Sequence, residues 1–261
     1  MDTPHAGAAA RYRLDGRVAL VAGAGRGIGR SVADALAQSG AEVWLMARTR
    51  TEIEQAAAGI RASGAKAHAV ACDATDTAAV RRAIAAIPRL DVLVNSAGTN
   101  LPEPFVDVSE EHLDLLVNLN VKAAFMVAQA AARKMLEASD RRERGGAIVN
   151  ISSQMGHVGS PNRTVYCMTK HALEGLTKAM ALELAQHNIR VNTVAPTFVE
   201  TPMTAPMFAR PEFGAWVRER IPLGRLGNLD EVAAAVVFVA SPAASLMTGT
   251  SLLIDGGWTA Q

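Results

Sequence analysis

Tyr166 and Lys170 stand four residues apart in the segment Tyr-Cys-Met-Thr-Lys. Residues at this spacing share one face of a helix, so the ammonium can sit close to the phenol. A free tyrosine titrates near ~10, and bringing its pKa to about 7 requires roughly 4 kcal/mol of preferential stabilisation of the phenolate. An ammonium together with an oxidised nicotinamide would supply that stabilisation. The pair therefore predicts reversible hydride chemistry, with Tyr166 as general acid and base.

A glycine-rich segment near the N-terminus indicates where the cofactor for such chemistry would bind. It runs Ala22-Gly-Ala-Gly-Arg-Gly-Ile-Gly29, after an apolar run and at the start of a helical pattern. Backbone amides at a helix start bind a pyrophosphate, and glycines let the backbone approach it closely. The critical spacing is Gly23, Gly27 and Gly29. Arg26 directly precedes Gly27, and Ile28 lies between the last two of these glycines. Alone, this loop leaves open a glycine-rich turn without a ligand.

The composition excludes several other classes of function. Of the 261 residues, 49% are hydrophobic and 4% aromatic, which suits buried parallel strands covered by small-residue helices. The formal net charge of +1 gives no field that would gather nucleic acid or an anionic membrane, so a small molecule is the expected ligand. Cys72 and Cys167 have neither metal-ligand nor disulfide spacing, which predicts no metal site and a reducing, cytoplasmic location.

The elements that must position these residues alternate regularly along the chain. Apolar runs predict seven parallel strands, and amphipathic stretches between them predict helices, which is the rhythm of a single-domain, Rossmann-type α/β fold with helices on both faces of a doubly wound sheet. The predicted strands are Val18–Val21, Val43–Met46, Ala67–Ala71, Val92–Asn95, Ala147–Ile151, Arg190–Ala195 and Leu252–Ile254. The predicted helices are Ile28–Ser39, Glu52–Ala62, Ala78–Ile87, Glu110–Ala138, Thr164–Gln186 and Asp230–Ala240.

Two segments fall outside this rhythm. Residues 1–13 lack the apolar core of a signal peptide and are expected to be a flexible tail or a small packing arm before one domain at 14–261. Residues 197–225 carry several prolines and methionines, which indicates a lid over the carboxyl ends of the strands, where ligands bind in such sheets. No apolar run is judged long enough to span a bilayer, so no membrane association is expected.

The chain resembles a classical short-chain dehydrogenase/reductase over nearly its whole length, from Leu14 to Gly257. Several motifs of that family recur in the correct order, which makes the resemblance specific. They are the glycine loop, Asp73, Asn95-Ser-Ala-Gly98, Asn120, Ser153, Tyr166 with Lys170, Pro196 to Thr201, and Asp255-Gly-Gly257. The resemblance implies a homotetramer packed through Glu110–Ala138 and Thr164–Gln186.

The resemblance also assigns cofactor contacts. Asp73 would contact the adenine, Asn95, Ala97 and Gly98 would shape the sheet and the ribose site, and Thr201 would reach the nicotinamide carboxamide. Pro196 and Val199 belong to that last segment. Two positions depart from the family pattern. Ala22 replaces a usual threonine and Thr197 replaces a usual glycine, which puts the loop geometry in doubt but not the reaction class.

The end of the second strand predicts the choice of cofactor. An acidic residue there would bind a ribose 2′-hydroxyl and a basic one a 2′-phosphate. Ala47 occupies the acidic position and Arg48 follows it. Arg48 and Arg26 can flank a phosphate with charge-assisted hydrogen bonds, which predicts NADP(H) over NAD(H). The alternative is that Arg48 and Arg50 are solvated charges opening the next helix.

Three further residues complete the expected reacting site. Ser153 lies just past the fifth strand and can donate to a carbonyl oxygen, to which Tyr166 would deliver a proton. By resemblance, Lys170 would hold the ribose hydroxyls, and Asn120, rather than the competing Asn118, would support a water that links Lys170 to solvent. Singly each residue has a structural explanation, but together, beside the cofactor motifs, they favour catalysis.

The substrate pocket is expected to combine polar and apolar side chains. Gln154, Met155 and His157 follow Ser153, and Met203, Met207 and Trp216 belong to the lid; Thr99, Asn100, Asn162 and Arg163 are further candidates. Amide and imidazole groups suit a polyhydroxy or dicarbonyl substrate better than a long acyl chain. The alternative is that Gln154 and His157 satisfy backbone groups or subunit contacts.

Within the family, several details most resemble the NADPH-dependent dicarbonyl and L-xylulose reductases. These are Ser153-Gln154, Tyr166-Cys167, Pro196-Thr197 and the placement of Arg48. A 3-oxoacyl thioester reductase, a sugar or polyol dehydrogenase, a silent NADP(H) sensor or scaffold and a Rossmann-type methyltransferase remain as alternatives. The basic run Arg141, Arg142 and Arg144 would suit an acidic carrier protein, but a solvated loop is the favoured interpretation.

Overall fold

Seven strands pair in parallel in the order β3-β2-β1-β4-β5-β6-β7 in the computed structural model, which describes residues 7–261. The predicted doubly wound α/β sheet is confirmed, and each strand lies within one residue of its predicted ends. The order reverses direction between β1 and β4, and this switch point opens a crevice at the carboxyl ends of the strands. The strands are β1 (Val18–Ala22), β2 (Glu42–Ala47), β3 (Ala67–Ala71), β4 (Val92–Asn95), β5 (Gly146–Ile151), β6 (Ile189–Pro196) and β7 (Ser251–Ile254).

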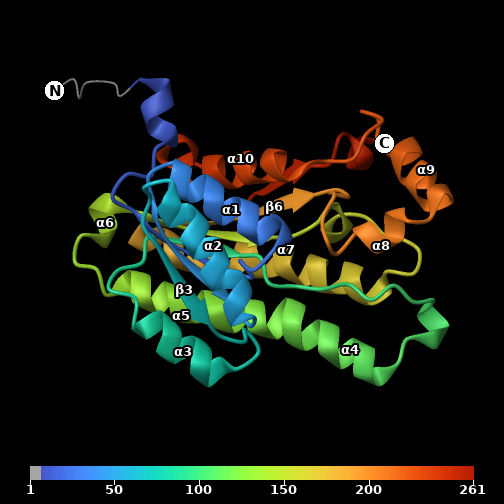
Figure 1. Ribbon diagram of the computed structural model, residues 1–261, viewed down its shortest axis with the longest axis horizontal. Coiled ribbons are helices and arrows are strands. Elements are labelled where there is room, and N and C mark those ends of the chain that lie inside the picture. Colours follow the sequence, from blue (N-terminus) through green and yellow to red (C-terminus); the bar gives the residue numbers. More distant parts are fainter. Residues whose placement is uncertain (1–6) are drawn as a thin grey trace.

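Helices cover both faces of the sheet (Figure 1). Apolar residues of α1, α2 and α10 pack on one face, and those of α3, α5 and α7 pack on the other. The α-helices are α1 (Gly27–Gln38), α2 (Arg50–Ala62), α3 (Thr77–Ala85), α4 (Glu110–Val117), α5 (Ala124–Leu136), α6 (Arg141–Arg144), α7 (Thr164–Leu184), α8 (Ala205–Phe208), α9 (Pro211–Arg220) and α10 (Leu229–Ala240). Short 3-10 turns are η1 (Ala8–Tyr12), η2 (Phe105–Asp107), η4 (Gln154–Gly156), η5 (Ala185–His187), η6 (Pro242–Ala244) and η7 (Trp258–Ala260).

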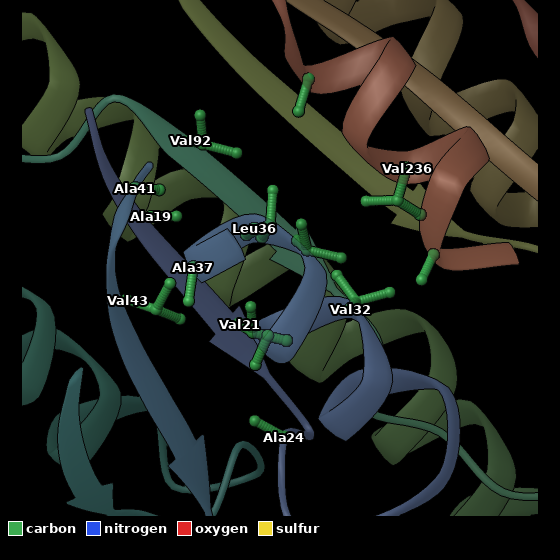
Figure 2. Packing of buried hydrophobic residues seen from close by; sticks show 14 of the residues in the cluster. Ala19, Val21, Ala24, Val32, Leu36, Ala37, Ala41, Val43, Val92 and Val236 are labelled. Carbon is green, nitrogen blue, oxygen red and sulfur yellow. The ribbon is translucent and has the colours of Figure 1, made fainter. Parts of the chain in front are cut away.

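The core beneath α1 shows why the composition is rich in alanine and valine. Val32 and Leu36 of α1 point down onto Ala19 and Val21 of β1, while Val236 of α10 closes the other side (Figure 2). Each of these side chains is almost fully buried. Burying a valine or leucine contributes roughly 1.5–3 kcal/mol. Small residues on the strand let the helix lie close to the sheet, and this packing holds the first turn of α1 at the crevice.

The long apolar stretch predicted as one helix is interrupted. It consists of α4, a π-helical segment η3 (Asn118–Ala123) and α5, which run on from one another. A π-turn inserts an extra residue into a helix and is frequent at functional sites. By length and composition alone, Glu110–Leu136 resembles a membrane span. This differs from the sequence-based expectation that no apolar run is long enough to cross a bilayer. In the structure, 44% of the most apolar window of this helix is buried inside the protein.

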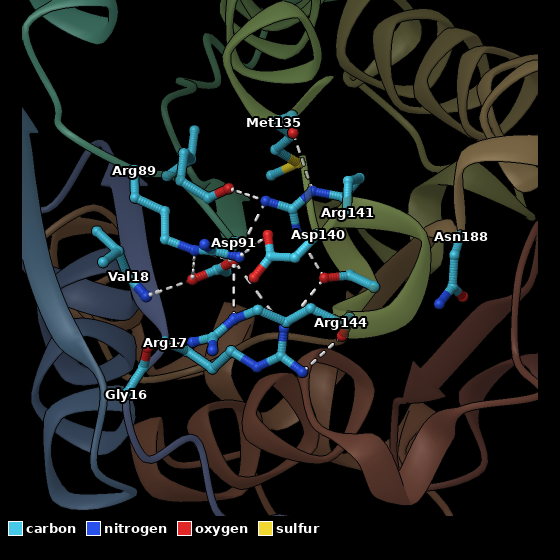
Figure 3. A network of polar contacts seen from close by, with 12 residues as sticks. Gly16, Arg17, Val18, Arg89, Asp91, Met135, Asp140, Arg141, Arg144 and Asn188 are labelled. Atoms are coloured by element: carbon cyan, nitrogen blue, oxygen red, sulfur yellow. Dashed lines mark hydrogen bonds and ion pairs between the residues drawn. The ribbon is translucent and has the colours of Figure 1, made fainter. Parts of the chain in front are cut away.

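At the amino-terminal end of β4, on the side of the sheet opposite the crevice, a buried carboxylate contacts several arginines (Figure 3). Asp91 is 1% exposed and accepts from the backbone amide of Val18 at 3.0 Å. Arg141 Nη2 lies 3.2 Å from Asp91 Oδ1, and Arg144 Nε lies 3.4 Å from the same oxygen. The interpretation of Arg141, Arg142 and Arg144 as a solvated loop is therefore wrong, because this run forms α6 and two of its guanidiniums neutralise Asp91.

The N-terminal segment and the predicted lid have distinct arrangements. The proposed tail lies partly outside the described residues, which begin at 7, and within them η1 packs on η6 while Arg11 donates to Ser245 Oγ at 3.2 Å. The predicted lid carries α8 and α9. Its aromatic side chains Phe208 and Phe213 pack against Phe198, and Trp216 stacks on Phe213. Helices α8 and α9 lie at the right of Figure 1.

Candidate active site

A cavity of about 570 Å³ occupies the crevice predicted at the carboxyl ends of the strands. Most of the predicted cofactor and catalytic residues line it, although they come from the segments that follow six different strands and from α7. They are Gly23, Arg26, Gly27, Ile28, Gly29, Arg48, Asp73, Ala97, Gly98, Ser153, Tyr166, Lys170, Pro196, Val199 and Thr201. Asn95 and Asn120 are not lining residues. A cavity of this size is ordinary for a cofactor and substrate site.

The glycine loop forms a tight cradle between β1 and α1. A Cβ on Gly23 would come within 2.6 Å of the Ala97 backbone nitrogen, and one on Gly29 would collide with the Gly23 carbonyl oxygen. Gly23 also has a φ of 84°, which side chains rarely adopt. Arg26 precedes α1 and makes no side-chain cap, so the first amides of the helix are left to a ligand. This cradle fits the pyrophosphate of a dinucleotide.

The far end of the cavity carries the charges expected to select the cofactor. Arg48 and Arg26 are both exposed at its wall, and the Arg48 charge acts on Asp73. Burial pushes the pKa of Asp73 up, but hydrogen bonds from Thr75 and the Arg48 charge outweigh it and leave that pKa below its usual value. Glu52, which sequence reasoning missed, also lines this end. The sequence could have indicated this residue, because Glu52 stands four positions after Arg48 and in the first turn of α2.

Asn120 sits in the π-turn and ties it to the loop after β4. Its Oδ1 accepts from the Thr99 amide and its Nδ2 donates to the Thr99 carbonyl, both at 2.9 Å. Nδ2 also lies 3.2 Å from the Thr169 hydroxyl on α7, beside Lys170. Asn95 plays a comparable internal role, because its Nδ2 donates to the Ala124 carbonyl at 2.8 Å. Both amides therefore hold the walls of the cavity in place.

The predicted catalytic side chains Ser153, Tyr166 and Lys170 all line the cavity. Tyr166 and Lys170 lie on α7, and the Lys170 Nζ is 5.5 Å from the centre of the Tyr166 ring. Lys170 is 5% exposed and donates to the Ile151 carbonyl at 2.8 Å. Ser153 is 8% exposed, and its Oγ accepts from the Met155 amide at 3.1 Å. This acceptance leaves the Ser153 hydroxyl proton available to donate, either to the Tyr166 phenol or to a group bound in the cavity.

Burial controls the protonation of this pair. It raises the pKa of Tyr166 to about 12, although a hydrogen bond to Ser153 and the charge of Arg163 act against it. Burial also lowers the pKa of Lys170 to about 8, against the opposing charge of Glu174. The predicted acidification of Tyr166 by Lys170 is thus absent in the protein without its cofactor. Desolvation outweighs it because Lys170 is almost fully buried and Tyr166 is partly buried beside it.

The predicted substrate residues separate into two groups. Gln154, Met155 and Met203 line the cavity, as do Thr99, Asn100 and Met207. Both polar atoms of the Gln154 amide are buried without a hydrogen-bond partner. His157 lies outside the lining and its Nε2 is 2.8 Å from the Ser251 hydroxyl, which matches the alternative of a structural contact. Trp216 is also outside the lining, where it stacks on Phe213.

The two departures from the family pattern have different consequences. Ala22 is fully buried in β1 and pairs with Met46 and Asn95, so the missing hydroxyl leaves no gap at the cavity surface. Thr197 lines the cavity, and its hydroxyl is buried without a partner. Its backbone amide donates to the Ile254 carbonyl at 3.0 Å. Thr197 therefore adds a polar group at the end of β6 that a glycine would not supply.

Comparison with known proteins agrees with the geometry. The model of the family described as Enoyl-(Acyl carrier protein) reductase matches residues 23–259. L-xylulose reductase from Bos taurus is 39% identical over 248 residues, which cover 95% of this chain and 98% of the relative. The chain belongs to the short-chain dehydrogenase/reductase family. It is therefore an oxidoreductase that acts on CH–OH and carbonyl groups, and the resemblance to reductases of the L-xylulose type is confirmed.

Other relatives of this short-chain dehydrogenase/reductase act on sugar acids. Gluconate 5-dehydrogenase from Gluconobacter oxydans is 40% identical over 253 residues, covering 95% of this chain and 96% of the relative. A crystal structure of a putative NAD(P)-dependent gluconate 5-dehydrogenase from Beutenbergia cavernae, with bound NADP, has a TM-score of 0.91 at 37% identity. It covers 96% of this chain and 100% of that one. The cofactor class is thus a pyridine nucleotide.

Proposed function

We propose that this enzyme interconverts a polyhydroxylated ketone and its alcohol with NADP(H). The observation that carries the substrate class is the Gln154 amide, which is 1% exposed and has a free donor and a free acceptor in the cavity. A buried amide with no partner is costly, and substrate hydroxyls would satisfy both of its atoms. Asn100 Oδ1 and the Thr197 hydroxyl, also buried without partners at the cavity, support the same substrate class.

The reacting residues divide the work between binding and proton transfer. Ser153 donates to the carbonyl oxygen, and Tyr166 delivers a proton to that oxygen during reduction or removes one from the alcohol during oxidation. When bound, the nicotinamide supplies or accepts the hydride. Lys170, held by the Ile151 carbonyl, binds the cofactor ribose and places positive charge near the phenol. Asn120 holds the loop at Thr99 and helix α7, which carries Lys170, in position through its hydrogen bonds to Thr99 and Thr169.

NADP(H) is the proposed cofactor because the charges at the adenosine end favour a 2′-phosphate. Arg48 and Arg26 both line the wall there and Ala47 offers no carboxylate for a 2′-hydroxyl. Glu52 acts against this preference, so the two guanidiniums must outweigh one carboxylate. Three of the related crystal structures carry bound NADP, which supports the assignment.

Self-association and location complete the proposal. The solvent face of α7 carries the small residues Ala172, Gly175 and Ala179 beside Met168 and Leu182, which are 49% and 83% exposed. Small residues allow close helix packing and exposed apolar side chains favour burial, so we propose a homotetramer that uses α7 and α5. Light scattering at micromolar concentration would test it, and a monomer would contradict it. A cytoplasmic location stays a prediction.

The substrate class is tested by replacing Gln154 with leucine. NADPH oxidation would be followed with L-xylulose and with diacetyl, a dicarbonyl without hydroxyl groups. Loss of hydrogen bonds to substrate hydroxyls should raise the KM for L-xylulose about 10-fold and leave the KM for diacetyl nearly unchanged. An equal effect on both compounds would show that Gln154 does not read hydroxyl groups. Turnover of a 3-oxoacyl thioester alone would favour the thioester alternative.

A further inference from the structure

Arg163 is a buried guanidinium without a counter-ion. It precedes α7, three residues before Tyr166, and is 6% exposed. Its Nε has no hydrogen-bond partner. Nη1 lies 3.5 Å from the carbonyl of the adjacent Asn162, and Nη2 lies 3.5 Å from the sulfur of Met207. Within residues 7–261, no carboxylate forms an ion pair or hydrogen bond with it.

Two other arginines, one buried and one half-buried, are satisfied. Arg141 donates to the carbonyls of Met135 and Leu90 and contacts Asp91. Arg190 donates to the carbonyls of Val239, Ala240 and Ser241 at the end of α10. An uncompensated buried charge is costly, and at the N-terminus of a helix the macrodipole adds to the cost of a cation. Arg163 therefore lacks a partner that the other two possess.

The position of Arg163 indicates where that partner would come from. Met207, which its Nη2 touches, lines the cavity, and so does Tyr166, on whose phenol the Arg163 charge acts. Arg163 is not itself a lining residue, but its Nη2 contacts the sulfur of a residue that is. Methionine is unbranched and flexible, so it can be displaced by a bound group at little cost.

We propose that Arg163 receives the carboxylate of the substrate, which makes the preferred substrate a polyhydroxy acid or the corresponding keto acid rather than a neutral sugar. The inference deepens the proposed function and rests on it. A guanidinium binds a carboxylate with two parallel hydrogen bonds, which would replace the weak contacts to Asn162 and Met207. Because Arg163 precedes Tyr166 by one helical turn, the bound carboxylate would fix which carbon of the chain faces the phenol.

A matched pair of substrates tests this subsite. Gluconate and glucitol differ only at C1, where one has a carboxylate and the other an alcohol. With NADP⁺ the wild-type protein should show a higher kcat/KM for gluconate, and Arg163→Met should lower the gluconate-to-glucitol ratio of kcat/KM at least about 10-fold. Arg163→Lys keeps the charge without the fork and should lie between the two. Arg210→Met, at an exposed arginine of the lid, is the control and should keep the wild-type ratio.

Binding separates a failure of this inference from a failure of the proposed function. Thermal protection of the NADP⁺-bound protein by gluconate and by glucitol needs no turnover. Gluconate should protect the wild type and Arg163→Lys more than glucitol does, and the difference should vanish in Arg163→Met. Equal protection by both compounds, or an unchanged difference in Arg163→Met, overturns the carboxylate subsite. Selective protection by gluconate without turnover of either compound would support the subsite and count against the proposed reaction.

Discussion

Replacement of Lys170 with methionine should change how the stability of the cofactor-free protein depends on pH. Lys170 is 5% exposed, and burial lowers the pKa of its ammonium from 10.5 to about 8. Its hydrogen bond to the Ile151 carbonyl and the charge of Glu174 offset only part of the desolvation. The desolvation of the protonated Lys170 side chain therefore lowers the free energy of unfolding of the wild type, and the methionine variant has no such cost.

The lowered pKa of Lys170 determines whether the free energy of unfolding rises or falls with pH. Since the folded pKa lies below the unfolded one, the unfolded chain binds more protons between pH 8 and 10.5, and the free energy of unfolding rises with pH there. The cost is fully present below about pH 8, where the lowered pKa of Lys170 corresponds to about 3 kcal/mol. Raising the pH from 7 to 10 should relieve most of it, roughly 2–3 kcal/mol.

Urea unfolding of the wild type and of Lys170→Met, at fixed protein concentration and several pH values from 7 to 10, measures this effect. The difference between the two free energies of unfolding should move by roughly 2–3 kcal/mol in favour of the wild type over that range. Tyr166 and the other titrating groups are present in both proteins and cancel. Lys178→Met, at an exposed lysine of the same helix, is the matched control for the loss of one lysine side chain. A flat difference for Lys170→Met would refute the reasoning.

Three other substitutions probe separate parts of the molecule. Tyr166→Phe should lower turnover at least about 100-fold while NADPH still protects against thermal unfolding; retained turnover would exclude the proton-transfer role. Arg48→Asp should lower the affinity for NADPH at least about 10-fold relative to that for NADH. Arg50→Asp, at a residue outside the cavity lining, should leave this ratio unchanged. Unchanged selectivity in Arg48→Asp would contradict the NADP(H) assignment. Asp91→Asn should cost about 3 kcal/mol in urea unfolding, because it leaves several arginines without their carboxylate, and a loss below about 1 kcal/mol would show that the network adds little stability.

The sheet and the position of the site were predictable from local patterns. Each strand is a short apolar run, and parallel strands deliver the residues that follow them to one edge, so Gly23, Asp73 and Ser153 had to meet there. The long-range pairs were not predictable. Nothing local connects Asp91 to Arg141, fifty positions later, and the π-turn around Asn120 arises from contacts with Thr99 and Thr169.

The pKa of Tyr166 in the cofactor-free protein could not be predicted from the sequence for the same reason. Sequence spacing shows that Lys170 is near, but it does not show how far each group is buried, and burial is the larger effect. With a Tyr166 pKa of about 12 and a Lys170 pKa of about 8, the phenol of the cofactor-free protein holds its proton at neutral pH. That state suits proton donation to a carbonyl. Alcohol oxidation needs additional positive charge beside the phenol, so cofactor binding must do more to prepare Tyr166 for oxidation than for reduction.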